Sequence, residues 1–131
     1  MKRIFACTLM IVILCLSTAC GNSMPTVDNA VEAIYADGWY STEYSAEQIA
    51  SIEEQFPLEG SITRIVHMVD QGTSVVPFDW AYIFEFSNEA DAILVEENRS
   101  AYVSTLESGL CVRFGTLLVF GTTERIADVG K

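Results

Sequence analysis

Asp79-Trp80-Ala81-Tyr82-Ile83-Phe84-Glu85-Phe86-Ser87 is the stretch of this sequence with the most regular pattern. Every second position from Trp80 to Phe86 is aromatic. Because side chains of a β-strand alternate between its two faces, the aromatic residues share one face and Ala81, Ile83 and Glu85 share the other. The pattern predicts a strand over 79–87 whose aromatic face lies in the core beneath the helices.

Two helices are predicted upstream of this strand. The first spans 27–37, begins after Thr26 as N-cap and ends at Gly38; a short strand over 39–44 follows it. The second spans 46–56 and stops before Pro57. Its start is marked by a capping box, formed by Ser45 and Gln48, and by a hydrophobic staple of Tyr44 and Ile49.

Further elements complete the pattern on either side of the aromatic strand. A β-rich run over 61–70 precedes it, and a third helix runs from 89 to about 106 after Asn88 as N-cap. A hairpin of 110–114 and 117–120, turned at Gly115-Thr116, is followed by a short last helix. No repeat or low-complexity tract interrupts the chain.

The order of these elements predicts an α+β fold. From residue 39 the order is β-α-β-β-α-β, the split βαβ arrangement of ferredoxin-like folds. We therefore expect a ferredoxin-like split βαβ sandwich with an extra N-terminal helix, an extra C-terminal strand and a mostly antiparallel sheet. Residues 27–131 are long enough for a single domain with one modest core.

One face of such a sheet is left without helices, and it carries a candidate interaction site. The alternation places Ala81, Ile83 and Glu85 there, and we expect Cys111 and Arg113 beside them. Contiguous exposed apolar area usually marks an interaction site, so Ala81, Ile83, Glu85 and Arg113 form the candidate interaction face. The alternative is that the N-terminal helix or a loop covers this face.

The N-terminus has the pattern of a secretory signal peptide. Lys2-Arg3 precede an apolar run over 4–16, and Ser17-Thr18-Ala19 supply small residues before a cleavage site. We therefore predict a signal peptide over 1–19 and an exported protein. An uncleaved membrane anchor is excluded by length, because a bilayer core needs about 20 apolar residues.

Cys20 after Ala19, followed by Gly21-Asn22-Ser23, resembles the lipobox of bacterial lipoprotein precursors. The resemblance implies a thioether-linked diacylglycerol on Cys20, a tether over 20–26 and a location in the bacterial cell envelope, anchored to the membrane outside the cytoplasm. Most lipoboxes have an aliphatic residue where this chain has Ser17. Because Ser17 and Ala19 also satisfy ordinary signal peptidase, a secreted soluble protein is the alternative.

The charge of the mature chain excludes one class of partner. The net charge of −11 becomes −13 without Lys2 and Arg3, with five basic residues left against 18 acidic ones. Affinity for nucleic acid comes largely from phosphate neutralisation by Lys and Arg. Nucleic acid is therefore excluded as a partner, and so is electrostatic docking on anionic lipid.

Cysteine and histidine content gives little support to an enzyme. Cys7 and Cys15 leave with the signal peptide, and Cys111 is then the one thiol beside Cys20, in an apolar segment where it acts as a small hydrophobe. No internal disulfide is expected. We predict no catalytic, metal or cofactor site.

The favoured function is a small binding or interaction module. Its partner is an unidentified protein or peptide, or a second copy of the chain. The alternative is a small envelope enzyme that uses His67, the single histidine, with Asp70, Asp79 or Cys111.

Overall fold

The structure is a computed structural model that describes residues 24–71 and 78–131. The predicted signal peptide over 1–19, Cys20 and most of the segment between the strands that end at Asp70 and begin at Trp80 lie outside the described residues. Within the described ranges, no helix is long and apolar enough to cross a membrane.

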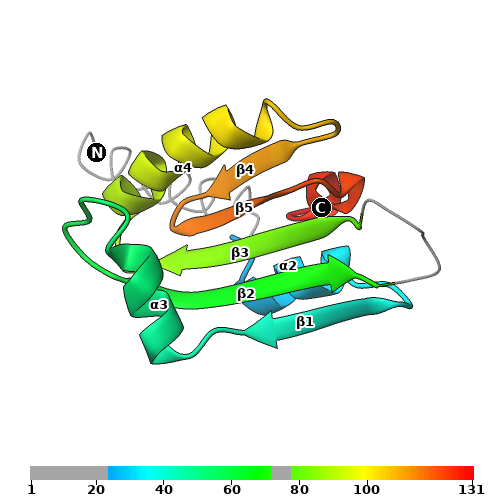
Figure 1. Ribbon diagram of the computed structural model, residues 1–131, viewed down its shortest axis with the longest axis horizontal. Helices are drawn as coiled ribbons and strands as arrows, with labels where there is room; N and C mark the ends of the chain where they lie inside the picture. The colour runs from blue at the N-terminus through cyan, green and yellow to red at the C-terminus, as the bar shows by residue number, and fades with distance from the viewer. Residues whose placement is uncertain (1–23, 72–77) are drawn as a thin grey trace, which may run out of the picture.

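Five strands form one sheet (Figure 1). They are β1 (Trp39–Glu43), β2 (Ile62–Asp70), β3 (Trp80–Phe86), β4 (Leu110–Phe114) and β5 (Leu117–Gly121). The strand order is β1-β2-β3-β5-β4, and each pair of neighbours is antiparallel. The expected α+β class and antiparallel sheet are confirmed.

The ferredoxin-like topology is not confirmed. In a split βαβ unit, two parallel strands joined by a crossover are separated by a third strand. The segment β3-α4-β4 has this arrangement, with β5 between its strands, whereas β1 and β2 are antiparallel neighbours. The segment between β1 and β2 carries a helix, but it leaves and re-enters the sheet at the same end (Figure 1). That segment therefore acts as a long hairpin connection, which the order of elements alone does not distinguish from a crossover.

In the described ranges, four helical segments pack on the sheet. They are α2 (Val27–Ile34), α3 (Ala46–Glu53), α4 (Glu89–Val103) and the 3₁₀ helix η1 (Glu124–Asp128). The three α-helices begin where the sequence predicts and end about one turn earlier. In α2 the helix ends because Tyr35 adopts an extended conformation, with φ −62° and ψ 137°. The capping box of Ser45 and Gln48 is present as predicted.

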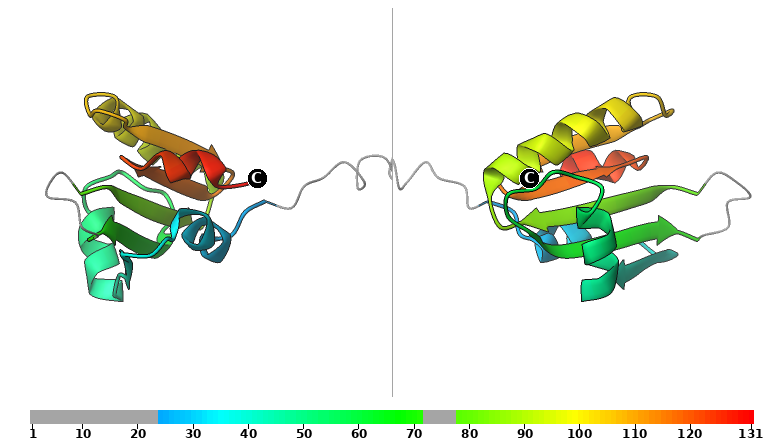
Figure 2. Two further views of the ribbon diagram at one scale, coloured as in Figure 1. Left: turned by 90° about the vertical axis from the view of Figure 1, so that its right-hand side faces the viewer. Right: turned by 60° about the vertical axis from the view of Figure 1, so that its left-hand side comes forward.

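The sheet carries a hydrophobic layer on each face. On one face α2 and η1 pack over a cluster that includes Ile83 and Val119. On the other face α4 and α3 pack over a second cluster that includes Phe84 and Leu118. Figure 2 shows α2 and α4 on opposite sides of the sheet. The described chain is therefore a three-layer arrangement of helix, sheet and helix.

The aromatic face of β3 lies toward α4, as the alternation predicts. Phe84 and Phe86 are each 2% exposed and belong to the core. Trp80 and Tyr82 are only half-buried. One half of the aromatic face is therefore core, and the other half remains accessible.

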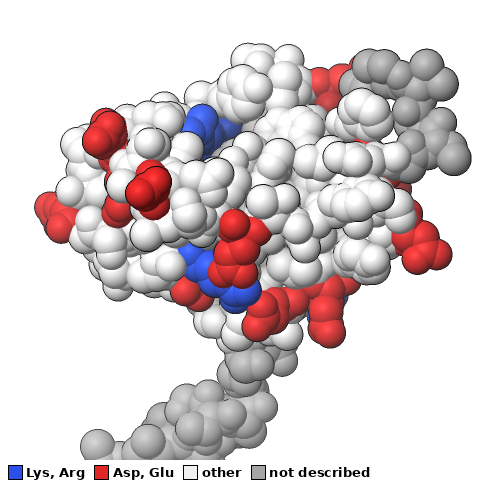
Figure 3. Space-filling model, turned by 60° about the horizontal axis from the view of Figure 1, so that its bottom comes forward, with Lys and Arg blue, Asp and Glu red and all other residues white. Residues whose placement is uncertain are grey.

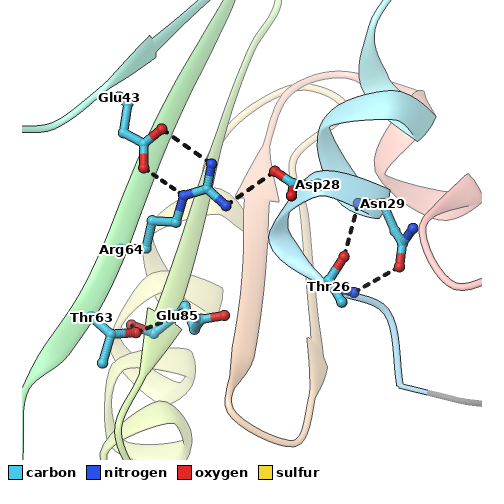
Figure 4. Close-up of polar contacts among 7 residues, drawn as sticks. All are labelled: Thr26, Asp28, Asn29, Glu43, Thr63, Arg64 and Glu85. Carbon is cyan, nitrogen blue, oxygen red and sulfur yellow. Dashed lines mark hydrogen bonds and ion pairs between the residues drawn. The ribbon is translucent and has the colours of Figure 1, made fainter.

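Ion pairs attach α2 to the opposite face of the sheet. The guanidinium of Arg64 on β2 contacts both carboxylate oxygens of Glu43, at 2.5 and 3.1 Å, and Asp28 of α2 at 3.0 Å (Figure 4). The three residues are partly exposed to solvent, so these pairs are modest contributors to stability. They fix the position of α2 on a face that its apolar side chains already cover.

Candidate functional site

A row of side chains runs across the sheet on the α4 side. Cross-strand pairing aligns His67 of β2 with Tyr82 of β3, Tyr82 with Phe120 of β5, and Phe120 with Cys111 of β4. The first three rings stack. His67 and Tyr82 have centroids 4.2 Å apart and planes 9° apart, and Tyr82 and Phe120 have values of 5.5 Å and 20°.

Tyr82 is at the centre of this aromatic cluster. Because its ring faces contact His67 and Phe120, a ligand can approach Tyr82 only at the ring edge or the hydroxyl. The hydroxyl lies 3.2 Å from that of Tyr44, which follows β1. Trp80 meets the Tyr82 ring in an edge-on contact, with centroids 5.7 Å apart. These contacts hold the cluster in one arrangement.

A groove of about 440 Å³ lies above this cluster. Eight residues line the groove, which we call the aromatic groove: Ile52, His67, Trp80, Tyr82, Phe84, Arg99, Tyr102 and Phe120. Its volume falls in the range of small-molecule sites, about 300 to 1,000 Å³.

Arg99 of α4 is the cation of the aromatic groove. Its guanidinium carbon lies 5.1 Å from the ring centroid of Phe56, beyond the end of α3, and 5.6 Å from that of Phe120. Its Nε atom is buried without a hydrogen-bond partner among the described residues. Arg64 and Arg113, in contrast, each pair with two carboxylates. Arg99 has no ion pair in the described part of the chain.

The charge in the aromatic groove is opposite to that of the molecule. Figure 3 shows acidic side chains spread over one face of the molecule, with few basic side chains among them. Yet no Asp or Glu lines the aromatic groove. A neighbouring pocket of about 630 Å³, which shares Trp80 and Tyr102, is lined by five acidic residues and Arg125. The acidic side chains therefore line the neighbouring pocket, and Trp80 and Tyr102 stand between that pocket and the aromatic groove.

Burial shifts the ionisation of two groove residues. It lowers the pKa of the His67 imidazole below its ordinary value. Burial, and then the hydrogen bond with Tyr44, raise the pKa of the Tyr82 phenol well above its usual range. Both side chains are therefore neutral at neutral pH, and Arg99 supplies the charge of the groove.

The candidate interaction face is covered at its centre, so the expectation of an open surface is wrong there. Ala81 and Ile83 have no exposed area. They pack beneath α2 and η1 in the same cluster as Val27 and Ile34. The apolar side of α2 needs a surface to cover, and this face of the sheet supplies it. The alternative of a face covered by the N-terminal helix is correct.

Arg113 and Cys111 lie on the other face, which also corrects the expectation. The pairing of β4 with β5 aligns Arg113 with Leu118 and Cys111 with Phe120, on the α4 side. Arg113 forms ion pairs there with Glu89 and Glu96 of α4. Glu85 does stay on the α2 side, where it accepts a hydrogen bond of 2.7 Å from the Thr63 hydroxyl (Figure 4).

The fold does not bring His67 together with the other residues of the enzymatic alternative. Asp70 and Asp79 do lie together, joined by a backbone hydrogen bond of 2.9 Å, but they line the neighbouring pocket and not the aromatic groove. His67 and Cys111 occupy β2 and β4, three steps of about 4.8 Å apart across the sheet, which is a separation of about 14 Å. Asp70, three residues after His67 on β2, points to the opposite face. Asp79 lies just before β3, and its carboxylate accepts a hydrogen bond from Thr122 at 3.2 Å.

Two further chemistries can be tested on the described residues. No group of three or more His, Cys, Asp or Glu in those ranges could hold a metal ion. Burial raises the pKa of the Cys111 thiol, which reduces the nucleophilic thiolate. Cys111 packs against the α4-side cluster, in agreement with its expected role as a small hydrophobe.

Comparison of the chain with protein-family models, curated proteins and solved structures finds no match. The function is therefore argued from the aromatic groove itself.

Sequence reasoning missed the aromatic groove. It assigned Trp80 and Tyr82 to the core together with Phe84, because all three share one strand face. It did not single out Arg99, whose neighbours in the sequence give no sign that it reaches Phe56 and Phe120. The one signal in the sequence is that Trp80 and Tyr82 carry polar tips, which favour a half-buried position.

Proposed function

We propose that this protein is an exported, lipid-anchored envelope protein that acts as a small binding module, with the aromatic groove as its binding site. The observation that carries the proposal is the groove's composition. A fixed aromatic cluster and one cation without a carboxylate partner line a volume suited to a small ligand. Concave sites with apolar walls and few polar groups are the usual form of ligand pockets.

The position of α2 is compatible with the proposed anchor. Met24 lies three residues before α2, which packs on the sheet face opposite the aromatic groove. A tether over 20–26 spans at most about 3.5 Å per residue. A lipid on Cys20 would therefore hold the domain close to the membrane by its α2 side, with the aromatic groove on the opposite side.

Membrane fractionation tests the anchor. Cys20→Ser should move the protein from the membrane to the soluble fraction, because two or three acyl chains give stable anchoring. Cys111→Ser is the matched control and should leave the protein in the membrane. Mass spectrometry that finds an unmodified N-terminal Cys20 on the native protein would favour the secreted alternative.

A fragment screen tests the binding site independently of the anchor. His67 is the single histidine and lines the aromatic groove, so its ring proton resonances report occupancy. Compounds of neutral, anionic and cationic classes should include ligands that shift these resonances. Ile52→Trp should fill the groove and abolish the shifts, while Ile93→Trp, at an exposed site on α4, should not. A screen in which no compound shifts His67 contradicts the proposal.

A further inference from the structure

We propose that the aromatic groove binds a small aromatic carboxylate, whose carboxylate pairs with Arg99 and whose ring packs among Trp80, Tyr82 and Tyr102. This inference rests on the proposed binding function and adds the chemical class of the ligand. It follows from the charge, hydrogen-bonding capacity and shape of the aromatic groove.

The positive charge of Arg99 favours an anionic ligand. Arg99 is the single charged residue among those that line the groove. Its contacts with Phe56 and Phe120 orient the guanidinium through its π face. They leave the in-plane N–H donors free to meet a carboxylate, which accepts two of them side by side.

Hydrogen bonding shows that the present arrangement is incomplete. The Nε atom of Arg99 is buried without a partner in the described part of the chain. A buried donor without a partner is costly. Nε is the one Arg99 nitrogen that is buried in this way, so a carboxylate in the groove would pair with the outer N–H groups and offset that cost. No carboxylate lines the aromatic groove, so the groove itself supplies no such acceptor.

The aromatic residues that line the groove favour a ligand with an aromatic ring. Tyr82 is stacked on both faces and offers only its edge and hydroxyl. Aromatic edges carry the positive end of the ring quadrupole, so they attract the face of a further ring or a carboxylate oxygen. Tyr102 is 49% exposed, which leaves it free to close over a ligand ring.

Fluorescence titration tests the ligand class on the full-length protein. The chain has two tryptophans, and Trp39 lies on the α2 side of the sheet. In a Trp39→Phe background, Trp80 alone reports on the aromatic groove. Phenylacetate should change its emission and bind at least tenfold more tightly than the neutral phenylacetamide or the ring-free acetate. The His67 resonances of the unmodified protein give the same comparison without the Trp39 substitution.

Substitution of single arginines tests whether Arg99 pairs with the ligand carboxylate. Arg99→Gln should weaken phenylacetate at least tenfold, since hydrogen bonds with charged groups are the stronger class, and should leave phenylacetamide unchanged. Arg125→Gln, which removes an exposed cation outside the aromatic groove, is the matched control and should leave both affinities unchanged.

The possible results separate the two proposals. Equal binding of phenylacetate and phenylacetamide at His67 overturns the anionic ligand and keeps the binding groove. Equal binding of acetate and phenylacetate contradicts the proposal that the ligand has an aromatic ring. Absence of any shift at His67 with all compounds overturns the binding groove itself. Tighter binding of N-acetyl-Ala-Ala-Phe than of its C-terminal amide and of phenylacetate supports the carboxylate chemistry and assigns it to a peptide end.

Discussion

The imidazole of His67 lies flat against the ring of Tyr82, with 4.2 Å between their centroids. The two residues come from adjacent strands, and their pairing places an ionisable ring inside an aromatic cluster. Desolvation there disfavours the charged imidazolium. The stacking therefore links the pH dependence of the domain to the same cluster that lines the aromatic groove.

We expect the pKa of His67 to lie below the ordinary value of 6.5, because burial disfavours its charged form. The unfolded chain then binds its proton at higher pH than the folded one. Stability should therefore fall as the pH drops below about 6.5 and level off below the folded pKa. An NMR titration of the single histidine measures the pKa. A value at or above 6.5 contradicts the expectation, and His67→Phe should flatten the slope of unfolding free energy in this window.

Asp91 should be a major contributor to stability. Its carboxylate accepts hydrogen bonds from the backbone N–H groups of Glu59 and Gly60, at 3.0 and 2.7 Å, and from Asn88. Asp91→Ala removes these hydrogen bonds to a buried carboxylate and should cost about 2 kcal/mol or more in urea unfolding. Glu97→Ala, at an exposed site of the same helix, should change little. Equal effects would mean that the segment before β2 does not depend on Asp91.

The same carboxyl predicts a loss of stability in acid. Burial raises the pKa of Asp91, but its hydrogen bonds outweigh burial and the pKa lies below its usual value. Its contribution is present above the unfolded value of 3.8 and is lost as the pH falls through the folded pKa. Urea midpoints at pH 5 and below should therefore decline less steeply in Asp91→Ala than in the unmodified protein.

Because the α2-side face of the sheet is buried, an Ile→Ala substitution there should lower stability more than the same substitution at an exposed site. Ile83 has no exposed area, whereas Ile93 on α4 is 41% exposed. Ile83→Ala should lower the free energy of unfolding by about 2 to 5 kcal/mol, and Ile93→Ala should change it by less than about 0.5 kcal/mol. Similar losses in the two variants would show that α2 does not cover the sheet.

Gly121 allows β5 to approach the start of β3 closely. A Cβ atom there would lie 2.1 Å from the carbonyl oxygen of Trp80 and 2.8 Å from the Cα atom of Ala81. Gly121→Ala should destabilise the domain by about 1 to 3 kcal/mol through overpacking. It should also shift Trp80 emission in the Trp39→Phe background. An unchanged spectrum and urea midpoint would contradict this close contact.

Local signals in the sequence determined the start of each helix and the alternation of the aromatic strand. Ser45 and Gln48 meet within four residues, so their capping box forms without the rest of the fold. The side-chain period of a strand likewise places Phe84 and Glu85 on opposite faces wherever the strand lies. Such features depend on contacts between near neighbours in the chain.

Only the tertiary structure decided which helices and strands pack against one another. The strand order and the side covered by α2 depend on contacts distant in sequence, which is why Ile83 is buried and the ferredoxin-like topology is not confirmed. A change of one residue in hairpin register moves Arg113 from one face to the other. Arg99 reaches Phe56 and Phe120 only after α4 has docked. The aromatic groove exists because three strands and two helices converge there, and no single segment encodes it.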